Sequence, residues 1–177
     1  KITLLTNIGQ KNDEKKFIQS NLEKNIKTIF LNKKNSPTII KKRFIEQINK
    51  TKVFGIYSLN DQPLDNDQEN KLNSKIQKLI QSHDLVIVSD YGHGFISDRT
   101  AKLIVNKSKF VAVNTQLNAS NLGFHVISKY VGANFITINE TEMRHELRNK
   151  TEDRMLLMKT LSKKLKSKYT HVTSGSS

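Results

Sequence analysis

The sequence contains no cysteine among its 177 residues. This absence excludes disulfide bonds, thiolate metal ligands and a cysteine nucleophile, and it is in keeping with a reducing compartment. Long hydrophobic runs are missing too, since no apolar stretch approaches the roughly 18–20 residues that cross a bilayer. The short apolar segment at residues 1–7 is typical of a strand and not of a secretory signal. We therefore expect a cytoplasmic protein with no membrane partner.

The motifs of several enzyme classes are absent as well. No loop has the G-x-x-x-x-G-K-[ST] spacing of a P-loop, and no G-x-S-x-G turn supports a serine hydrolase. The five histidines show no H-E-x-x-H or similar spacing, so we do not expect a zinc site. The composition, 36% hydrophobic and 26% charged, is that of an ordinary globular domain with a core of its own.

Acidic residues are fewer than basic ones. The sequence has 16 Asp and Glu residues and 30 Lys and Arg residues, which gives a net charge of +14. Such a surface can bind nucleic acid through phosphate contacts, or attract anionic substrates such as ATP or a sugar phosphate. It can also reflect a lysine-rich composition with solvated side chains. The lysines are spread along the chain without an aromatic-interleaved RNA-binding pattern. We favour solvated lysines, place attraction of anionic substrates second, and do not expect a nucleic-acid partner.

Short apolar strands alternate with amphipathic helices along most of the chain. This alternation predicts an α/β fold in which helices cover both faces of a parallel sheet. The first helix has Phe17, Ile18 and Leu22 on one face. The predicted strands are 1–6, 26–32, 85–88, 110–113, 135–138 and 169–173, and the predicted helices are 13–25, 67–81, 97–105, 140–148 and 152–166.

The segment from about 37 to 60 breaks this pattern. Its apolar stretches, 38–45 and 53–57, are separated by the polar run 47–51, and no helical pattern lies between them. This arrangement predicts an antiparallel hairpin. We expect a single α/β domain with this hairpin inserted at one edge.

Polar residues stand where the predicted strands end. In open α/β sheets, ligands bind outside the carboxyl ends of the strands. Asn, Asp and Gly are also normal turn residues, so one such ending carries no information. Five such strand endings along one rim favour a polar ligand site. They begin at Asn7, Ser89, Asn114, Asn139 and Thr173.

Two of these positions involve a carboxylate. Asp90 lies between a strand and a glycine-rich turn, where it can accept a hydrogen bond from a sugar hydroxyl or, equally, cap the amides of the turn. Asn139 and Glu142 stand at the start of a helix with the spacing of a capping box. The alternative role of this pair is to organise a magnesium–phosphate site, which needs hard oxygen ligands or water acceptors. The local pattern favours capping.

Four stretches, taken together and in order, resemble bacterial heptose-phosphate kinases of the ribokinase-like (PfkB) family. The run 84–94, D-L-V-I-V-S-D-Y-G-H-G, is similar to V-x-S-D-Y-x-K-G, and 136–142, I-T-I-N-E-T-E, is similar to N-x-x-E. The run 171–175, H-V-T-S-G, is similar to a V-T-x-G strand end, and 37–44, P-T-I-I-K-K-R-F, to the T-x-x-K-x-R strand of a β lid. The resemblance implies a ribokinase-like parallel-sheet sandwich whose small antiparallel β lid, at about 37–60, closes over the sugar.

The resemblance also implies an activity, namely transfer of the γ-phosphoryl group of ATP to a hydroxyl of a sugar or sugar phosphate of the heptose type. ATP and Mg²⁺ would be the cofactors, with no direct protein ligand to the metal. For Lys41 and Arg43, protection of a strand edge by charge is an equally simple role. By resemblance, the substrate side comprises Asp90, Tyr91, Gly92, Asn114, Lys41 and Arg43, the magnesium–phosphate side Asn139 and Glu142, and the nucleotide side Thr173 and Gly175.

The chain departs from the family pattern at three positions. Asn114 and Gln116 stand where the family has the aspartate and lysine of V-D-P-K, and His93 stands in place of a lysine. These changes leave the acceptor sugar open. The run N-T-Q-x-N-A-x-N at 114–121 resembles heptose-kinase-like proteins that are fused to a nucleotidyltransferase domain, which is a further expected partner.

Two family segments have no counterpart, namely an amino-terminal glycine pair and the G-A-G-D segment that carries the aspartate base. They would lie before Lys1 and beyond Ser177. We therefore interpret the chain as part of a kinase domain, residues 1–177, that has no catalytic base of its own and is inactive alone. The resemblance further implies a homodimer formed through the lid. The alternatives are a non-catalytic module that binds sugar or nucleotide and, less favoured, a basic nucleic-acid-binding domain.

Overall fold

The computed structural model describes residues 1–11, 14–117 and 127–175. The chain divides into two compact units, Lys1–Leu64 (unit 1) and Asp65–Ser177 (unit 2). Each unit is built from its own strands and helices. The assignment of the whole chain to one domain therefore stays a prediction.

Unit 1 begins with a parallel pair of strands. β1 (Ile2–Gly9) and β2 (Ile26–Lys33) pair in register from Ile2 opposite Ile26 to Gly9 opposite Lys33. The helix between them, α1 (Lys15–Ser20), is shorter than the predicted 13–25, whose first residue lies outside the described part of the chain.

The early end of α1 has a local cause. The side chains of Ser20 and Asn21 both donate hydrogen bonds to the carbonyl of Phe17, at 2.9 and 2.8 Å, which offers the backbone an alternative to a further helical turn. Phe17, on the predicted apolar face of this helix, is 66% exposed. A helix of six residues is too short to present a full apolar stripe.

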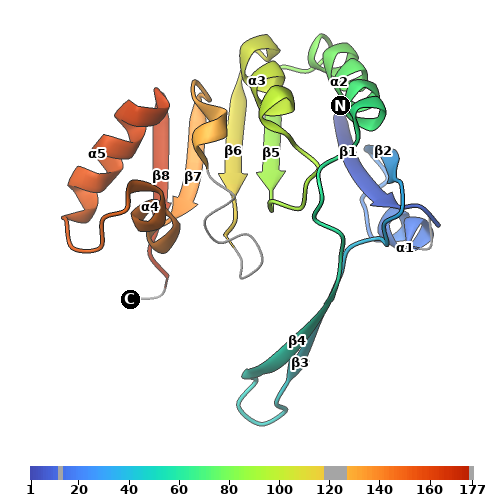
Figure 1. The fold of residues 1–177 in the computed structure, drawn as a ribbon, viewed down its shortest axis with the longest axis horizontal. Helices are drawn as coiled ribbons and strands as arrows, with labels where there is room; N and C mark the ends of the chain where they lie inside the picture. The colour runs from blue at the N-terminus through green and yellow to red at the C-terminus, as the bar shows by residue number, and fades with distance from the viewer. Residues whose placement is uncertain (12–13, 118–126, 176–177) are drawn as a thin grey trace. The chain divides into compact units, whose positions relative to one another are not determined.

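The predicted hairpin is confirmed as a two-stranded antiparallel sheet, β3 (Ile40–Ile45) and β4 (Lys52–Ser58), which we call the β lid. Figure 1 shows it as a long ribbon that extends beyond the β1–β2 pair. Lys41 lies opposite Tyr57, and Phe44 lies opposite Phe54. Because side chains alternate between faces, the lid has one face with Lys41, Arg43 and Tyr57 and a second face that carries Phe44 and Phe54.

The two ends of the lid are fastened to the ends of β1 and β2. The amide of Gly9 donates to Thr38 Oγ1 at 2.9 Å, and a Cβ at Gly9 would lie only 2.1 Å from the backbone nitrogen of Thr38. Lys33, whose side chain is buried, donates through Nζ to the carbonyls of Asn60 at 2.6 Å and Gln62 at 2.5 Å. Burial holds the pKa of Lys33 below its usual value, against the opposing charge of Asp61.

Unit 2 contains a four-stranded parallel sheet with the order β5-β6-β7-β8. Figure 1 shows the four strands side by side, with their carboxyl ends at one edge. Each strand lies close to its predicted position at both ends. The strands are β5 (Val86–Asp90), β6 (Val111–Thr115), β7 (Phe135–Asn139) and β8 (Tyr169–Thr173).

The long helices of unit 2 also follow the predictions closely, because each begins at a side chain that can cap it. Ser97 accepts from the amide of Thr100 and begins α3, as predicted. Asp65 and Asp153 cap α2 and α5 in the same way. The elements are α2 (Asn66–Ile80), α3 (Asp98–Lys107), α4 (Glu140–Leu147), α5 (Arg154–Leu165) and the short 3₁₀ helix η1 (Ile127–Tyr130).

Burial alternates along the strands of unit 2, so the two faces of the sheet differ. Val88, Val113 and Ile136 are neighbours across β5, β6 and β7, and all three are buried. The other face includes Ile87, 73% exposed, and Tyr169, 49% exposed. Covering of this second face by helices therefore stays a prediction, while an α/β fold with a parallel sheet, helices and a small antiparallel sheet is confirmed.

Within residues 1–11, 14–117 and 127–175, no helix combines the length and the apolar character needed to cross a bilayer.

Candidate functional site

The candidate site lies along the carboxyl edge of the unit 2 sheet. Four of the predicted residues stand there, one on each of its strands. Asp90 ends β5 opposite Thr115 of β6, and Asn139 ends β7 opposite Thr173 of β8. Asn114, one residue before the end of β6, donates to the carbonyl of Thr137 at 3.1 Å.

Asp90 is enclosed by protein groups. Its side chain, 5% exposed, accepts from Lys129 Nζ at 2.6 Å and from the Tyr130 hydroxyl at 2.5 Å through Oδ2. Oδ1 accepts from the amide of Gly92 at 2.9 Å, which is the turn-capping role that the sequence allowed. A direct contact between Asp90 and a sugar stays a prediction.

These partners set the ionisation of the cluster. Burial by itself would raise the pKa of Asp90, but the charge of Lys129 and the hydrogen bonds from Lys129, Tyr130 and Gly92 together hold this pKa below its usual value. Burial, followed by the charge of Asp90, raises the pKa of Tyr130. Asp90 is thus a carboxylate, and Tyr130 a neutral donor, at any pH near neutrality.

The turn after β5 has a backbone that needs glycine. Gly92 and Gly94 have φ values of 70° and 72°, in the region that glycine adopts without steric cost. His93 between them is buried, whereas Tyr91 is 44% exposed. Of the predicted substrate residues in this turn, Tyr91 therefore presents its side chain outward, and Gly92 offers its backbone.

The residues that follow β6 form hydrogen bonds to the end of β5 and to the start of α4. The amide of Gln116 donates to the carbonyl of Asp90 at 3.0 Å, and the amide of Leu117 donates to Glu142 Oε1 at 2.9 Å. The ends of β5, β6 and α4 are therefore joined by hydrogen bonds. The remainder of the predicted N-T-Q-x-N-A-x-N run, 118–121, lies outside the described residues.

Asn139 and Glu142 form the capping box that the sequence favours. Asn139 Oδ1 accepts from the amide of Glu142 at 2.8 Å, and Glu142 Oε2 accepts from the amide of Asn139 at 3.1 Å. Glu142 is buried, and each of its oxygens binds a backbone amide. Such a carboxylate fits an indirect role toward Mg²⁺, in which it orients the backbone and water around the ion.

The described residues hold no cluster of three or more His, Cys, Asp or Glu side chains that could by itself bind a metal. A Mg²⁺ ion that accompanies a nucleotide commonly takes its ligands from phosphates and water, with one or two carboxylates. The donors at the carboxyl edge suit that arrangement better than an all-protein cage.

The remaining predicted residues are spread more widely. Thr173 is exposed at the end of β8, and Gly175 has a φ of 61°, where an added Cβ would meet nothing within 4 Å. Lys41 and Arg43 lie on β3 in unit 1, where Lys41 Nζ stands 5.8 Å from the centre of the Tyr57 ring. Whether these two lid residues reach a ligand held by unit 2 stays a prediction.

Sequence reasoning missed Lys129 and Tyr130, although both touch Asp90. They lie in η1, within a stretch that carries neither helical nor strand periodicity. Tyr130 is fully buried and 40 residues from Asp90 along the chain. No local pattern reports a contact across that separation.

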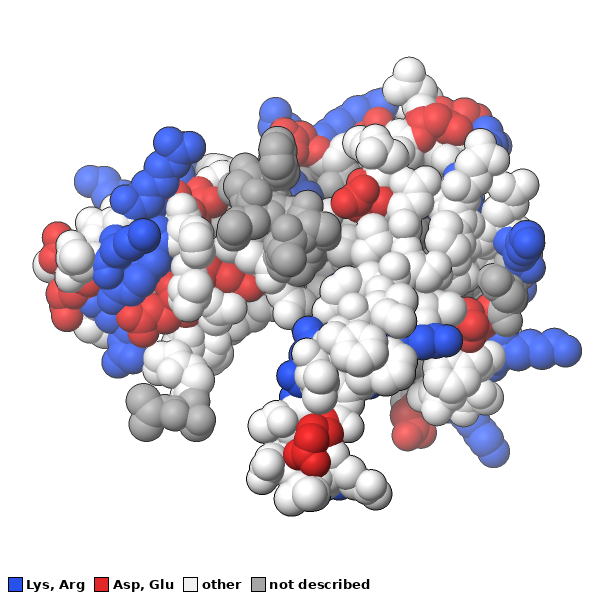
Figure 2. Space-filling model, turned by 60° about the horizontal axis from the view of Figure 1, so that its bottom comes forward, with Lys and Arg blue, Asp and Glu red and all other residues white. Residues whose placement is uncertain are grey.

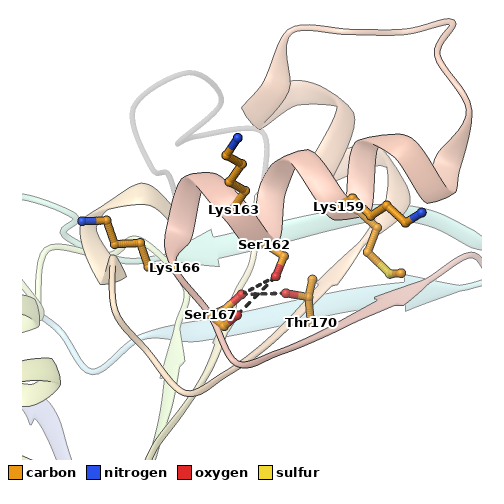
Figure 3. A pocket seen from close by; sticks show the side chains of 7 residues that line it. Lys159, Ser162, Lys163, Lys166, Ser167 and Thr170 are labelled. Atoms are coloured by element: carbon orange, nitrogen blue, oxygen red, sulfur yellow. Dashed lines mark hydrogen bonds between the residues drawn. The ribbon is translucent and has the colours of Figure 1, made fainter.

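A shallow groove of about 560 Å³ lies elsewhere, against α5 and the start of β8 (Figure 3). Three hydroxyl groups in it bond to one another, with Ser167 Oγ at 2.7 Å from Thr170 Oγ1 and 3.3 Å from Ser162 Oγ. The ammonium groups of Lys163 and Lys166 point away from these hydroxyls. The groove is at the amino end of β8, opposite the carboxyl edge, and the ammonium groups of Lys163 and Lys166 do not join its hydroxyl groups at one point.

Basic side chains do not gather at one place on the face drawn in Figure 2. Acidic and neutral side chains stand between them.

No protein-family model matches the chain. Among curated proteins, the bifunctional protein HldE of Wolinella succinogenes is 26% identical over 131 residues, which are 74% of this chain and 27% of HldE. Among solved structures, phosphofructokinase-2 from Escherichia coli superposes with a TM-score of 0.71 at 10% identity, covering 98% of this chain and 55% of that one. Ribokinase from Giardia lamblia gives 0.68 at 16% identity, with 98% and 54% covered.

The chain thus spans about half the length of the sugar kinases that it resembles in structure, and about a quarter of HldE. Sequence identities this low support a shared fold and do not indicate a shared substrate. The carboxyl edge described above is where α/β folds of this kind bind ligands. The fold of this chain is ribokinase-like, as the motifs of the sequence predict.

Proposed function

We propose that this chain is part of an enzyme that transfers the γ-phosphoryl group of ATP to a sugar or sugar phosphate of the heptose type, in the synthesis of a nucleotide sugar or polysaccharide. The observation that carries the proposal is the row of polar residues at the carboxyl edge of the unit 2 sheet, within a ribokinase-like fold. Phosphoryl transfer depends mainly on positioning and on stabilisation of charge, which such an edge can supply.

On the substrate side, we assign Tyr91, the backbone of Gly92, and Asn114 to binding of the sugar. Asp90 supports this side by holding the amide of Gly92. We further assign Lys41 and Arg43 to a phosphate group of the substrate, because both lie on the basic face of the lid. A guanidinium can bind a phosphate through two parallel hydrogen bonds.

On the nucleotide side, we assign Asn139 and Glu142 to the magnesium–phosphate end, and Thr173 and Gly175 to the nucleotide. Bound Mg²⁺ would supply neutralisation of the phosphate charge. Glu142 supports this end by fixing Leu117 and the first turn of α4 through two backbone amides. We assign the general base to none of these 177 residues, so we expect no efficient turnover by this chain alone.

Two partner proposals accompany this function. The apolar face of the lid leaves Phe44 and Phe54 exposed, at 44% and 50%, and their rings stack with centroids 4.3 Å apart. We propose that this face pairs with the same face of a second copy, which leaves Lys41 and Arg43 for the substrate. A fused nucleotidyltransferase domain is the second proposal, and it is supported by the similarity to a protein described as bifunctional.

A thermal-shift experiment on the 177-residue chain tests the proposal, with magnesium–ADP, a heptose phosphate and a short oligonucleotide as ligands. A ligand at about 100 times its dissociation constant stabilises the folded state by roughly 2.7 kcal/mol. We expect stabilisation by magnesium–ADP or by the heptose phosphate at physiological salt. The variant Asn139→Ala should lose the shift with magnesium–ADP and keep the shift with the sugar phosphate.

Two results would replace this proposal. Stabilisation by the oligonucleotide alone, fading as salt rises, would favour a basic nucleic-acid-binding domain. Binding of ligands by a protein that includes the whole domain, without ATP-dependent phosphorylation of any sugar tested, would favour the non-catalytic kinase-like module.

A further inference from the structure

Lys129 joins the two ends of the turn that follows β5. Its Nζ donates to Asp90 Oδ2 at 2.6 Å, just before the turn, and to the carbonyl of Ile96 at 2.8 Å, at its far end. The Lys129 side chain is 11% exposed. A single, largely enclosed ammonium group thus spans the segment 91–96, which we call the β5 turn.

The β5 turn depends on such contacts for its shape. It lies between the last residue of β5 and Ser97, the N-cap of α3, and so falls outside both the strand ladder and the helical hydrogen bonds. The amide of Gly92 donates to the side chain of Asp90. The backbone changes direction at Gly92 and again at Gly94, where φ is 70° and 72°. Ile96 is held by Lys129.

Lys129 also changes the charge of the site. Without it, the carboxylate of Asp90 would stand as a buried, uncompensated negative charge beside the turn to which we assign the sugar phosphate. Two negative charges close together repel strongly in a partly desolvated site. The ammonium group cancels the charge of Asp90, so the turn can present its backbone and Tyr91 to an anionic ligand.

We propose that Lys129 is a positioning residue for substrate binding, which fixes the β5 turn and neutralises Asp90 so that the turn can accept a sugar phosphate. The inference rests on the proposed function and adds to it a residue from η1. Lys129 acts through the turn and does not contact the substrate. Tyr130, which donates to the same carboxylate oxygen, supports Asp90 without reaching Ile96.

Hydrogen exchange of the 177-residue chain tests the structural half of this inference without any ligand. In Lys129→Met we expect the amides of 92–97 to exchange at least about tenfold faster, because a charge-assisted bond of this kind is lost. Amides of α5 (Arg154–Leu165) should exchange as before. Lys129→Arg should restore most of the protection, since a guanidinium can bridge the same two acceptors.

If Lys129→Met does not fold, the double variant Asp90→Asn/Lys129→Met replaces it, because both buried charges are then removed together. In this variant the new amide side chain can still accept from the Gly92 amide, so only the far end of the turn, near Ile96, should exchange faster. Unchanged exchange near Ile96, or faster exchange throughout unit 2, would overturn the role of Lys129 in fixing the turn.

A thermal shift with a heptose phosphate and with magnesium–ADP tests the functional half. Lys129→Met should bind the heptose phosphate at least about tenfold more weakly and magnesium–ADP unchanged, and Lys129→Arg should recover sugar binding. Equal weakening of both ligands, or none, would overturn the positioning role. If the unaltered chain binds neither ligand, the proposed function fails, and the substrate role of Lys129 fails with it. The exchange result still decides whether Lys129 fixes the turn.

Discussion

Asp90 ends β5 at a position where the sequence allowed either a ligand contact or a turn cap. In the structure, its oxygens accept from Gly92, Lys129 and Tyr130. The contact with Gly92 is local, and the sequence pattern includes it as an alternative. The contacts with Lys129 and Tyr130 join segments about 40 residues apart, so no spacing rule could predict them.

The depressed pKa of Asp90 predicts a pH dependence of stability. Because the folded-state pKa lies below the unfolded value of about 3.9, the unfolded chain binds more protons between the two values. The contribution of Asp90 is therefore present above about pH 4 and is lost as the pH falls through the folded-state pKa. Urea unfolding at pH 7 and at about pH 3 measures this loss.

Asp90→Asn should lower the unfolding free energy at pH 7 by about 3 kcal/mol, because Lys129 is left largely enclosed without its counter-charge. The same variant should also show a weaker pH dependence of the unfolding free energy in acid, because the titrating carboxyl group is gone. Asp84→Asn is the matched control, since Asp84 forms an exposed ion pair with Lys109. This variant should leave the midpoint of urea unfolding at pH 7 unchanged. An acid dependence as steep in Asp90→Asn as in the unaltered chain would contradict the assignment.

At the scale of elements, the capping residues explain why the sequence located helices α3 and α4 so closely. Ser97 and Asn139 each bond an amide three residues ahead, and such a bond involves only residues that are close in sequence. The first helix begins at Lys15, and Glu14 at its N-cap position makes no side-chain cap hydrogen bond among the described residues. It ends at Ser20, where local side-chain bonds to the Phe17 carbonyl compete with the helix. Apolar spacing alone overestimated its length.

The caps of α4 and α5 permit a test that separates stability from binding. Asn139→Ala and Asp153→Ala each remove an N-cap and should each lower the unfolding free energy by about 1 kcal/mol. Only Asn139→Ala should also weaken binding of magnesium–ADP, because Asn139 is assigned to the magnesium–phosphate end and Asp153 is not. Titration of both variants with magnesium–ADP by calorimetry measures the difference, and equal affinities would remove Asn139 from the nucleotide site.

The base of the lid is set by a close backbone approach. Gly9→Ala should lower the unfolding free energy by about 2–3 kcal/mol, because the new Cβ would meet the backbone of residues 36–38, at 2.1 Å from the nitrogen of Thr38. Gly55→Ala is the control within the lid, since its nearest neighbour is the flexible Tyr57 hydroxyl at 3.1 Å. Chemical denaturation compares the two, and similar losses would contradict the close approach.

At the scale of the whole molecule, the lid is the feature whose exposed surface favours a partner. On its apolar face, Phe44, Phe54 and Ile56 are each at least 44% exposed. An isolated two-stranded sheet is marginally stable in water, so covering this face would stabilise the lid. Its other face carries Lys41 and Arg43. This division of the faces is set by the register of the hairpin, which the sequence pattern alone did not specify.

Phe54→Ser tests the proposed dimer. We expect the chain to self-associate at micromolar concentration and Phe54→Ser to weaken that association at least about tenfold, because a central aromatic contact is removed. Tyr57→Ser changes an exposed aromatic residue on the opposite lid face, across from Lys41, and should leave the association unchanged. Sedimentation velocity measures all three proteins, and a monomeric unaltered chain would reject pairing through the lid.

The sequence by itself determined the order of strands and helices, the hairpin at 37–60, the caps at Ser97 and Asn139, and the ribokinase-like resemblance. Each of these depends on residues within short stretches, where backbone propensity, side-chain period and capping act together. Only the tertiary structure decided which face of the unit 2 sheet is buried, that Glu142 holds the amide of Leu117, and that Lys129 neutralises Asp90. Those features arise from contacts between segments far apart in the sequence, whose partners are chosen by packing and burial and not by local pattern.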